Sequence, residues 1–437
     1  MKRNFFLILF LSKIIFVFAA KPALLAGPMT GHTTATTTKV WLLARDVKNI
    51  SLVITEKNSG KEVQKLSTCS DSCLNSKSQF PVTFSFENLL PETEYNLKIF
   101  LDENEIKNDF SFTTMKEISV NDFSFLLGSC AMIFPKWLWL FFPQNKGKIF
   151  VPMKDFKSDF MLWLGDNVYY RRKEHRSLDG MFKRHLIERK RERMGSFLKS
   201  MPQYSIWDDH DFGPNDSEGS FPLKENSCAI QKNFWANPDC EGTHGVYTHF
   251  RHYDAEFILT DNRYFRTEPD DKNPTLLGDE QLQWIFNILK NSDATFKFIV
   301  TGSQVLNEKN LNESYSHFPA ERQRIFDFIK ENNITGVIFL TGDRHHSELL
   351  KMNQPDNYPL YDFTCSPLSG LARPTMKTHE ATNPLRIENT LLTFHNFGKI
   401  SIKGEKGKRN CTIETYDEKA NKIWEYVVNE NELKKQK

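Results

Sequence analysis

The sequence predicts an α/β fold preceded by a small β-sandwich, in a chain of 437 residues. Three observations support this prediction. Residues 22–115 alternate apolar and polar side chains in the way that half-buried strands do. From about residue 120, short apolar runs alternate with helical segments, which is typical of layered sheets and helices. Four of the apolar runs end abruptly in Asp, His, Asn or Cys side chains.

The N-terminal domain is predicted from its strands and from one corner. Residues 40–43, 50–54 and 82–86 have the alternation and the β-branched and aromatic content of strands. Residues 89–99 resemble the corner of a fibronectin-III-like β-sandwich, in which the hydroxyl of Tyr95 bonds back to the chain. This domain has no convergent set of His, Asp and Cys, so we expect it to pack against or shade the larger domain.

The larger domain is expected to contain helices near residues 178–198 and 281–290. Its last strands are predicted to be antiparallel, around residues 390–397, 399–402, 411–416 and 422–428. The aromatic-rich segment 132–150 is predicted to form a rim or lid rather than a membrane span.

The most informative strand end is that at Asp166. The apolar run 160–164 and Gly165 precede this carboxylate directly, and Tyr169 follows three residues later. Strand ends of this kind are where α/β sheets bind ligands. A carboxylate can bridge two cations, and a deprotonated phenol is a hard ligand suited to Fe(III). Taken alone, Asp166 is equally compatible with a turn or a helix N-cap.

Three further strand ends supply donors of the same kind. The run 123–127 is followed by Cys130. The run 204–207 is followed by Asp208, Asp209, His210, Asp211 and Asn215, and the run 337–341 is followed by Asp343, Arg344, His345 and His346. The three carboxylates within positions 208–211 repel one another unless a cation or strong donors are present. Neighbouring residues at a strand end point in different directions, so only one histidine of the pair is expected to be a ligand, namely His345. Cys130 alone is also compatible with a buried thiol in a turn, and Asp343 with a helix cap. Together, the four strand ends predict one metal site assembled from a folded sheet.

These segments resemble the motifs of the PhoD-type alkaline phosphatases, within the wider metallophosphoesterase group. Residues 259–266, 277–284 and 366–370 resemble further segments of that family, and the resemblance extends from about Pro22 to the C-terminal strands. It implies an αββα metallophosphoesterase sandwich of two mixed sheets between helices. The expected division is a signal peptide at 1–19, a fibronectin-III-like β-sandwich at 22–115 and a PhoD-like metallophosphatase domain at 120–430.

The resemblance also implies a mixed-metal site. Its Fe(III) ligands would be Cys130, Asp166, Tyr169 and His345, and its Ca(II) ligands would be Asp166, Asp209, Asn215 and Asp343. Such cations convert a bound water to a metal-activated hydroxide and clamp the phosphoryl group. The family often shows Asp-Asp-His-Glu before its Asn, whereas the fourth residue here is Asp211, followed by Phe-Gly-Pro. This departure leaves open which of Asp208, Asp209 and Asn215 are ligands.

His210 and Arg344 are the candidate catalytic residues. His210 is expected to protonate the leaving oxygen or to hold phosphate, with a bond to a nearby carboxylate as the alternative. Arg344 is expected to contact phosphate, although Arg171 and Arg263 have the same planar donors and the sequence does not choose among them.

The N-terminus and the overall charge limit the cellular compartments and the kinds of partner that we expect for this chain. Residues 1–19 carry Lys2-Arg3, then an apolar stretch and a small-residue cleavage pattern, which indicates a secretory signal peptide. Lys13 interrupts the apolar stretch and argues against a stable membrane span, with an uncleaved anchor as the alternative. We therefore expect a secreted, periplasmic or cell-surface protein. The net charge of +2 predicts no specific binding to nucleic acid.

Seven cysteines suit an oxidising compartment. Three disulfides are possible between neighbours in the sequence, namely Cys69 with Cys73, Cys228 with Cys240, and Cys365 with Cys411. The pairing cannot be deduced from the sequence. Cys130 is left over, and the resemblance assigns it to the metal.

The expected function is that of a secreted metal-dependent phosphoric ester hydrolase, an alkaline phosphatase D-like phosphomonoesterase or phosphodiesterase. One alternative is a phospholipase D-like hydrolase of phosphatidyl lipids, which the aromatic segment 132–150 favours. Another is a surface binding protein with an inactive metal site. The sequence does not determine the natural ester, the metals bound or the oligomeric state.

Overall fold

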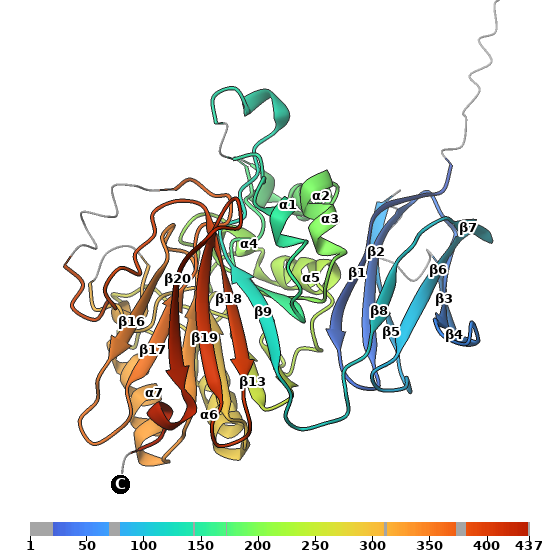
Figure 1. Cartoon of the computed structure of the whole chain (residues 1–437). Helices are drawn as coiled ribbons and strands as arrows, with labels where there is room; N and C mark the ends of the chain where they lie inside the picture. The colour runs from blue at the N-terminus through green and yellow to red at the C-terminus, as the bar shows by residue number, and fades with distance from the viewer. Residues whose placement is uncertain are drawn as a thin grey trace, which may run out of the picture.

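The computed structural model describes residues 21–69, 79–142, 145–171, 173–309, 313–372 and 382–435. The predicted signal peptide at 1–19 lies outside the described residues. Two regions are visible in Figure 1, a small group of strands near the N-terminus and a larger body of sheets and helices. No helix in the described part of the chain is long and apolar enough to span a bilayer.

The N-terminal region consists of two small antiparallel sheets. One contains β1 (Ala23–Thr33), β2 (Thr38–Arg45) and β5 (Gln79–Phe86); the other contains β3 (Asn49–Glu56), β4 (Glu62–Cys69), β6 (Glu94–Leu101), β7 (Asn104–Ile106) and β8 (Ser111–Thr113). Alternate residues of β2 and β3, such as Leu42 and Leu52, share one buried apolar core. At the start of β6, the Tyr95 hydroxyl accepts a hydrogen bond from the backbone N–H of Leu90 at 2.8 Å, which is the predicted corner contact.

Two mixed six-stranded sheets form the larger body. The first has the order β11 (Gln203–Ile206), β10 (Phe160–Leu164), β9 (Phe123–Gly128), β18 (Asn396–Lys403), β19 (Asn410–Asp417) and β20 (Lys422–Asn429). The second has the order β12 (Thr248–His252), β13 (Ala255–Leu259), β14 (Phe296–Thr301), β15 (Val337–Thr341), β17 (Leu360–Thr364) and β16 (Glu348–Met352). The strands β9, β10 and β11 are parallel, as are β13, β14, β15 and β17.

The last three strands are antiparallel, as predicted. The two strands expected at 390–397 and 399–402 are instead the single strand β18. Residues 390–395 contribute only an isolated bridge, between Leu392 and Ser347. Extended chain without a continuous neighbour forms no ladder, which the local pattern does not reveal.

Seven α-helices are described, and they flank the sheets. They are α1 (Phe150–Met153), α2 (Leu178–Arg189), α3 (Glu192–Leu198), α4 (Asp209–Phe212), α5 (Lys224–Phe234), α6 (Asp279–Asn291) and α7 (Pro319–Glu331). The predicted helix at 178–198 is two helices, because the backbone at Arg191 is extended and breaks the hydrogen-bond ladder there. The predicted helix at 281–290 corresponds to α6.

Apolar side chains hold the layers together. The Phe125 ring on β9 packs edge-to-face on Phe257 of β13 at 5.1 Å, so the two large sheets face each other. On the outer face of the first sheet, Trp163 packs on Phe197 of α3 at 5.9 Å. On the outer face of the second sheet, leucines and isoleucines of α6 and α7 join the main core. The result is a mixed α/β fold with helices outside two sheets.

The N-terminal sheets are joined to the body by hydrogen bonds. The backbone N–H of His32 donates to the Ala236 carbonyl at 2.7 Å, and the Trp41 indole donates to the Asn233 carbonyl at 2.8 Å. Figure 1 shows α2, α3 and α5 between the large sheets and the N-terminal strands. The expectation that this region packs against the larger body is confirmed.

Candidate metal centre

Four parallel strands end at one edge of the molecule, where the predicted donors meet. The chain leaves β9 toward Cys130, β10 toward Asp166, β11 toward Asp208 and β15 toward Asp343. The strands approach one another so closely that only glycine fits at one point. A Cβ atom on Gly342 would lie 2.4 Å from the carbonyl oxygen of Leu164. The Gly-Asp pairs in the sequence therefore mark the points where strands from both sheets come together.

Four of the predicted ligands have backbone conformations that side chains rarely adopt. The φ angles are +57° at Cys130, +56° at Asp166, +61° at Asp343 and +55° at His345. Each such residue costs about 1–3 kcal/mol unless its surroundings hold it in place. At the first two, the backbone N–H of Ala131 donates to the Asp166 carbonyl at 2.9 Å and links the turns. Residues of this kind cluster at functional sites.

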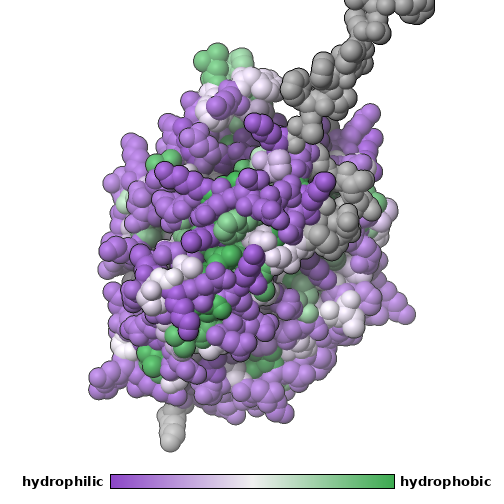
Figure 2. Space-filling view, turned by 90° about the vertical axis from the view of Figure 1, so that its right-hand side faces the viewer, coloured by the Kyte–Doolittle hydropathy of each residue, from purple (hydrophilic) through white to green (hydrophobic). Residues whose placement is uncertain are grey.

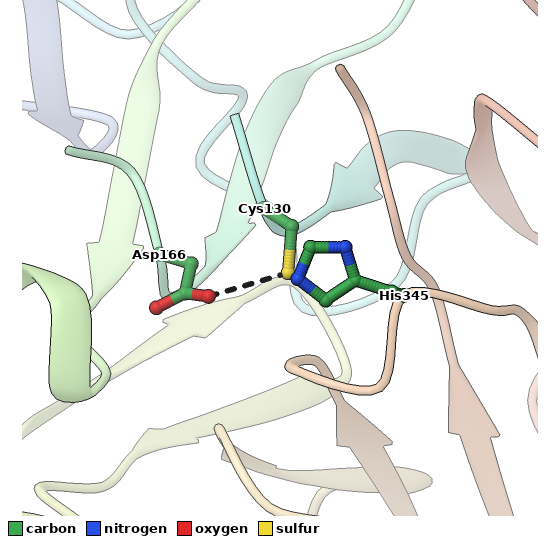
Figure 3. A group of neighbouring side chains, drawn as sticks. All are labelled: Cys130, Asp166 and His345. Atoms are coloured by element: carbon green, nitrogen blue, oxygen red, sulfur yellow. Dashed lines mark hydrogen bonds between the residues drawn. The ribbon is translucent and has the colours of Figure 1, made fainter. Parts of the chain in front are cut away.

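The first group of donors consists of Cys130, Asp166 and His345 (Figure 3). One ligand atom from each lies within 4.8 Å of the others, and all three side chains are buried. The Cys130 thiol donates to Asp166 Oδ2 at 3.4 Å, and the Tyr169 hydroxyl donates to the same oxygen at 2.8 Å. Thiol, phenol, carboxylate and imidazole groups therefore lie together, and such a set could hold a metal ion.

Two contacts orient the members of this group. His345 Nδ1 lies 2.6 Å from the Leu371 carbonyl oxygen, which can only accept, so Nδ1 carries the proton and Nε2 is the unprotonated nitrogen of the neutral ring. The Ser366 hydroxyl donates to Cys130 Sγ at 3.1 Å. Ser366 lies in the late segment 366–370 that resembles the family, although the sequence did not suggest this contact.

The second group of donors consists of Asp166, Asp209 and His210, again with ligand atoms within 4.8 Å of one another. Asp166 belongs to both groups and lies between them. Its Oδ1 atom and the Oδ1 atom of Asp209 are buried without a hydrogen-bond partner. The His210 ring lies 4.2 Å from the ring of Tyr169, measured between centroids. An unpaired buried carboxylate oxygen is rare in a folded protein and fits a cation.

Burial favours the protonated form of the acids at this site. It raises the pKa of Asp166 well above its usual range, and the neighbouring Cys130 and Asp209 add to the effect. Burial and then the charge of Asp343 raise the pKa of the Cys130 thiol to about 11. Burial and then Asp208 raise the pKa of Asp343 to about 8. Asp209 is the exception, because Arg263 and then His210 outweigh burial and lower its pKa. At Asp166, Cys130 and Asp343 the charges of the chain do not outweigh burial, whereas a multivalent cation would. The residues present therefore fit a metal centre.

A cavity of about 450 Å³ opens beside both groups. The predicted residues that line it are Asp209, His210, Asn215, Asp343, Arg344 and His345. The Asn215 side chain is exposed and belongs to neither donor group, so the structure brings it to the cavity without placing it among the buried ligands. The sequence did not indicate Glu313 and His317, which line the same cavity. Neither follows a predicted strand, so no local pattern marked them.

Asp208, which forms a third group of candidate donors with Asp209 and Glu313, is hydrogen-bonded to an arginine. Arg263 Nε donates to Asp208 Oδ1 at 2.6 Å, and another nitrogen of the same guanidinium donates to Glu313 at 2.9 Å. Arg263 is fully buried and does not line the cavity, so it is not placed to contact phosphate. Arg171 donates instead to the Ile133 carbonyl at 3.4 Å, which leaves Arg344 as the predicted arginine at the cavity.

Asp211, at the departure from the family pattern, holds the Asp166 turn in place. Its carboxylate accepts the backbone N–H groups of Asn167 at 3.1 Å and Val168 at 2.8 Å. A shorter acid therefore stands where the family often has Glu, and it ties α4 to the loop after β10. His346 points away from the centre, with Nε2 3.1 Å from Glu348.

The five cysteines whose side chains are described are free thiols. Cys365 Sγ lies 3.9 Å from Asn396 at the start of β18, whereas Cys411 pairs with Ile402 near its end. This length of strand is roughly 20 Å, and a disulfide joins Cα atoms less than about 7 Å apart, so the fold excludes a Cys365–Cys411 bond. Cys228 and Cys240 lie in one small apolar cluster without a bond. The possible Cys69–Cys73 pair falls outside the described side chains.

Comparison with known proteins agrees with this geometry. The alkaline phosphatase D of Bacillus subtilis (strain 168) is 28% identical over 250 residues, which make up 44% of this chain and 42% of that protein. The match thus spans less than half of the length of this relative. A solved structure of PhoD has a TM-score of 0.73 at 17% identity and covers 91% of both chains. The purple acid phosphatase PPD1 from yellow lupin seeds has a TM-score of 0.66 at 10% identity, over 92% of this chain and 74% of the other.

At these identities the solved structures establish a shared fold and nothing more. The family model described as PhoD-like phosphatase is more specific, because it matches residues 125–413 and includes every donor of both groups. That segment is well over half of the chain and contains the turns at Cys130, Asp166 and Asp343. By this match, the chain belongs to the PhoD-like phosphatase family.

Proposed function

We propose that this chain is a secreted, metal-dependent hydrolase of phosphate esters, either a phosphomonoesterase or a phosphodiesterase. The observation that supports it best is the position of Asp166, which is shared by two groups of buried or partly buried donors beside an open cavity. A carboxylate with one oxygen bound by Tyr169 and the other unpaired is suited to bridging two cations. The arrangement needs no nucleophile from the protein.

In this proposal Cys130, Asp166, Tyr169 and His345 hold Fe(III), and Asp166, Asp209, Asp343 and Asn215 hold Ca(II). The thiolate and phenolate suit iron, and the oxygen donors suit calcium. When bound, these cations supply an activated nucleophile from water and neutralise charge on the phosphoryl oxygens.

The protein's own residues bind and orient the ester. Arg344 lines the cavity and donates to the phosphoryl oxygens, since a guanidinium matches their geometry. His210 lines the same cavity, and its ring is held against Tyr169. From there it gives a proton to the leaving oxygen or holds it through a hydrogen bond. The buried turns at Asp166 and Asp343 keep the donors fixed during the reaction.

The domain boundaries and the cellular location are part of the same proposal. We infer that residues 22–115 form a fibronectin-III-like domain and residues 120–430 the PhoD-like domain. The apolar residues 1–19 act as a signal peptide, and the protein works in the periplasm, at the cell surface or outside the cell. Mass spectrometry of the mature N-terminus tests this, and an intact residue 1 in exported protein contradicts a cleaved signal.

The first test is an assay of the purified protein on p-nitrophenyl phosphate and on its bis-ester, with Ca(II), from neutral to alkaline pH. Hydrolysis of either ester is expected, and the faster ester identifies the class. EGTA should abolish turnover and excess Ca(II) should restore it, whereas EGTA already saturated with Ca(II) serves as the control. No turnover by protein shown to contain its metals contradicts the proposal and favours a binding protein with an inactive site.

A matched pair of variants tests whether ester hydrolysis depends on the two donor groups. Asp166→Ala should lower the turnover of either ester by about 100-fold or more, since even the loss of an outer partner of a metal ligand costs 10–100-fold. Glu268→Gln changes a carboxylate that lines the same cavity outside both donor groups, and it should stay close to the wild type. Equal activity in the wild type and in both variants would contradict the metal mechanism.

A hydrolase of phosphatidyl lipids is a second candidate. The observation that favours it is the apolar loop that begins near Phe134, a few residues after Cys130. Release of choline or phosphate from phosphatidylcholine vesicles, compared with hydrolysis of the soluble bis-ester, distinguishes this candidate from a general esterase.

A further inference from the structure

The described residues 134–142 form a loop that projects from the body and exposes large apolar side chains at its tip. Trp137 is 73% exposed, Leu140 84% and Phe141 70%. Figure 1 shows this loop rising beyond α1 and α2, at the end of the molecule where β9 ends. Figure 2 shows hydrophobic side chains at the top of the molecule, standing above a mostly hydrophilic surface.

The loop is not a lid over the candidate metal centre. The sequence predicts a rim or a lid for this segment, and none of its described residues lines the cavity beside the two donor groups. The segment turns three large apolar side chains outward. Exposure of this extent at three neighbouring positions is unusual for a soluble surface and indicates a contact with something else.

The loop has an internal structure that presents these side chains. The rings of Phe134 and Phe142 pack edge-to-face with centroids 4.9 Å apart, and the Trp139 indole donates to the Phe134 carbonyl at 2.7 Å. Between them lies the short 3₁₀ helix η2 (Lys136–Leu138). Some aromatic residues therefore build the loop, while Trp137 and Phe141 point away from it. The exposure is a property of an ordered turn.

Both legs of the loop are attached to the body. On the N-terminal side, Arg191 donates to the Ile133 carbonyl at 2.8 Å. On the C-terminal side, Asn145 is fully buried and donates to the Ser369 carbonyl at 2.6 Å, and Arg193 donates to the Lys146 carbonyl at 2.8 Å. The loop is therefore anchored to the body on both sides of its tip.

The charged side chains of the loop segment itself have one sign. Residues 132–149 contain Lys136, Lys146 and Lys148 and no Asp or Glu. At the base, the Arg193 guanidinium lies 5.4 Å and the Lys146 ammonium 5.8 Å from the centre of the Trp139 ring. Cations therefore lie below and beside an apolar tip that ends in Trp, Leu and Phe.

This arrangement matches the layers of a membrane surface that contains anionic lipids. Trp and Phe side chains prefer the boundary between headgroups and acyl chains, and Lys and Arg interact with the anionic headgroups just above it. A protein groove would also accept the apolar side chains, but the unbroken positive charge of the segment favours the anionic lipid surface.

We propose that Trp137, Leu140 and Phe141 insert into the surface of an anionic membrane and dock this protein there. The insertion does not depend on the proposed hydrolysis. Because the loop starts a few residues after Cys130, docking turns the end of the molecule that carries the metal centre toward the lipid. Esters at or near the membrane surface are then the nearest substrates.

Vesicle sedimentation of the full chain tests the docking. The probes are phosphatidylcholine vesicles with about one third phosphatidylserine, and the same vesicles without phosphatidylserine. Replacing all three tip residues by Ser should lower the partition coefficient for the anionic vesicles by about tenfold or more. The control carries Leu90→Ser and Ile118→Ser, which alter residues 59% and 50% exposed elsewhere, and it should bind like the wild type.

A second readout is specific for insertion and unaffected by any other part of the chain that binds lipid. Brominated lipids quench tryptophans that enter the acyl region. The wild type should therefore lose more emission than the Trp137→Leu variant, which keeps an apolar side chain. Equal quenching of these two proteins overturns the proposal, whatever their affinity.

The charges are tested separately. Lys136→Glu together with Lys148→Glu should weaken binding to the anionic vesicles several-fold, with little change for neutral vesicles. Equal binding of the wild type and the triple Ser variant overturns the proposal. Self-association that is lost in the triple Ser variant, without vesicle binding by the wild type, also overturns it and assigns the tip to a contact between copies. Loss of ester hydrolysis in Asp166→Ala should leave docking unchanged, so the two proposals can fail independently.

Discussion

The candidate metal centre and the contact between the N-terminal sheets and the body both bury titratable groups, but they satisfy them in opposite ways. At the contact, the Tyr204 hydroxyl accepts the backbone N–H of Thr33 at 3.2 Å and lies 3.4 Å from His32. At the centre, Asp166 and Asp209 each keep a buried oxygen without a partner. A polar group buried for stability finds its partner within the chain, whereas one that binds a ligand leaves an atom for it.

The carboxylates of the site itself differ in their partners. Arg263 donates to Asp208, whose other oxygen is buried without a hydrogen-bond partner, whereas its neighbour Asp209 lines the cavity. The two residues are adjacent in sequence and equally buried, and together with Glu313 they form a further group of candidate donors. Only their surroundings therefore distinguish the acid that is paired with an arginine from the acid that faces the cavity.

The largest effect on stability is expected at Arg263. Arg263→Leu leaves the buried Asp208 without a cation and Glu313 with Arg266 as its remaining partner, so the free energy of unfolding should fall by about 3–5 kcal/mol. Urea denaturation measures it. Arg324→Leu breaks the exposed pair with Asp279 and should cost less than about 1 kcal/mol. Similar losses in the two variants would contradict the structural role of the buried network.

Asp166→Asn should separate activity from stability. The neutral amide replaces a buried carboxylate whose Oδ1 atom has no hydrogen-bond partner, so the metal-free protein should melt at an unchanged or higher temperature while ester hydrolysis falls about 100-fold or more. Asp362→Asn is the matched control, because Asp362 accepts the Thr341 hydroxyl at 2.7 Å and the Val305 N–H at 2.8 Å. That control should lower the melting temperature. A destabilised, active Asp166→Asn protein would reverse the comparison.

His32 makes the contact with the N-terminal sheets sensitive to acid. Burial, and then Lys39, lower the pKa of His32 from 6.5 to about 4. Between these values the unfolded chain binds a proton and the folded protein does not, so stability is complete above pH 6.5 and is lost as the pH falls toward 4. His32→Gln should remove about 2–3 kcal/mol of this loss. Denaturation curves at several pH values measure it, and the exposed His244→Gln should leave the slope unchanged.

The smallest effects are expected at two buried tyrosines, one at the N-terminal contact and one at the metal centre, which compare the two regions directly. Tyr204→Phe leaves the Thr33 N–H unpaired and should cost about 1–2 kcal/mol of stability without loss of ester hydrolysis. Tyr169→Phe should do the reverse, with a reduced iron content and little change in unfolding. Elemental analysis and denaturation of both variants provide the measurements. Equal iron content in Tyr169→Phe and the wild type would remove Tyr169 from the proposed ligands.

Much of the centre was predictable because it lies at strand ends. Apolar runs followed by Gly-Asp or Gly-Ser-Cys identify the strands and the donors after them, and parallel strands bring such ends to one edge. The structure brings Cys130, Asp166 and His345 together as the pattern predicts. The break between α2 and α3, the loop at 390–395 and the separation of Cys365 from Cys411 were not predictable, because each depends on neighbours distant in sequence.

By itself, the sequence determined the α/β character, the strand ends that carry the donors, and the resemblance to the PhoD-type family. These follow from local periodicity and from residue types at short spacing. The tertiary structure alone decided that Arg263 neutralises Asp208 but not Asp166, that Asp211 supports the Asp166 turn, and that the tip near Trp137 stays exposed. The physical reason is that a charge or an apolar surface is satisfied by whatever the fold brings beside it, and local sequence carries no record of those partners.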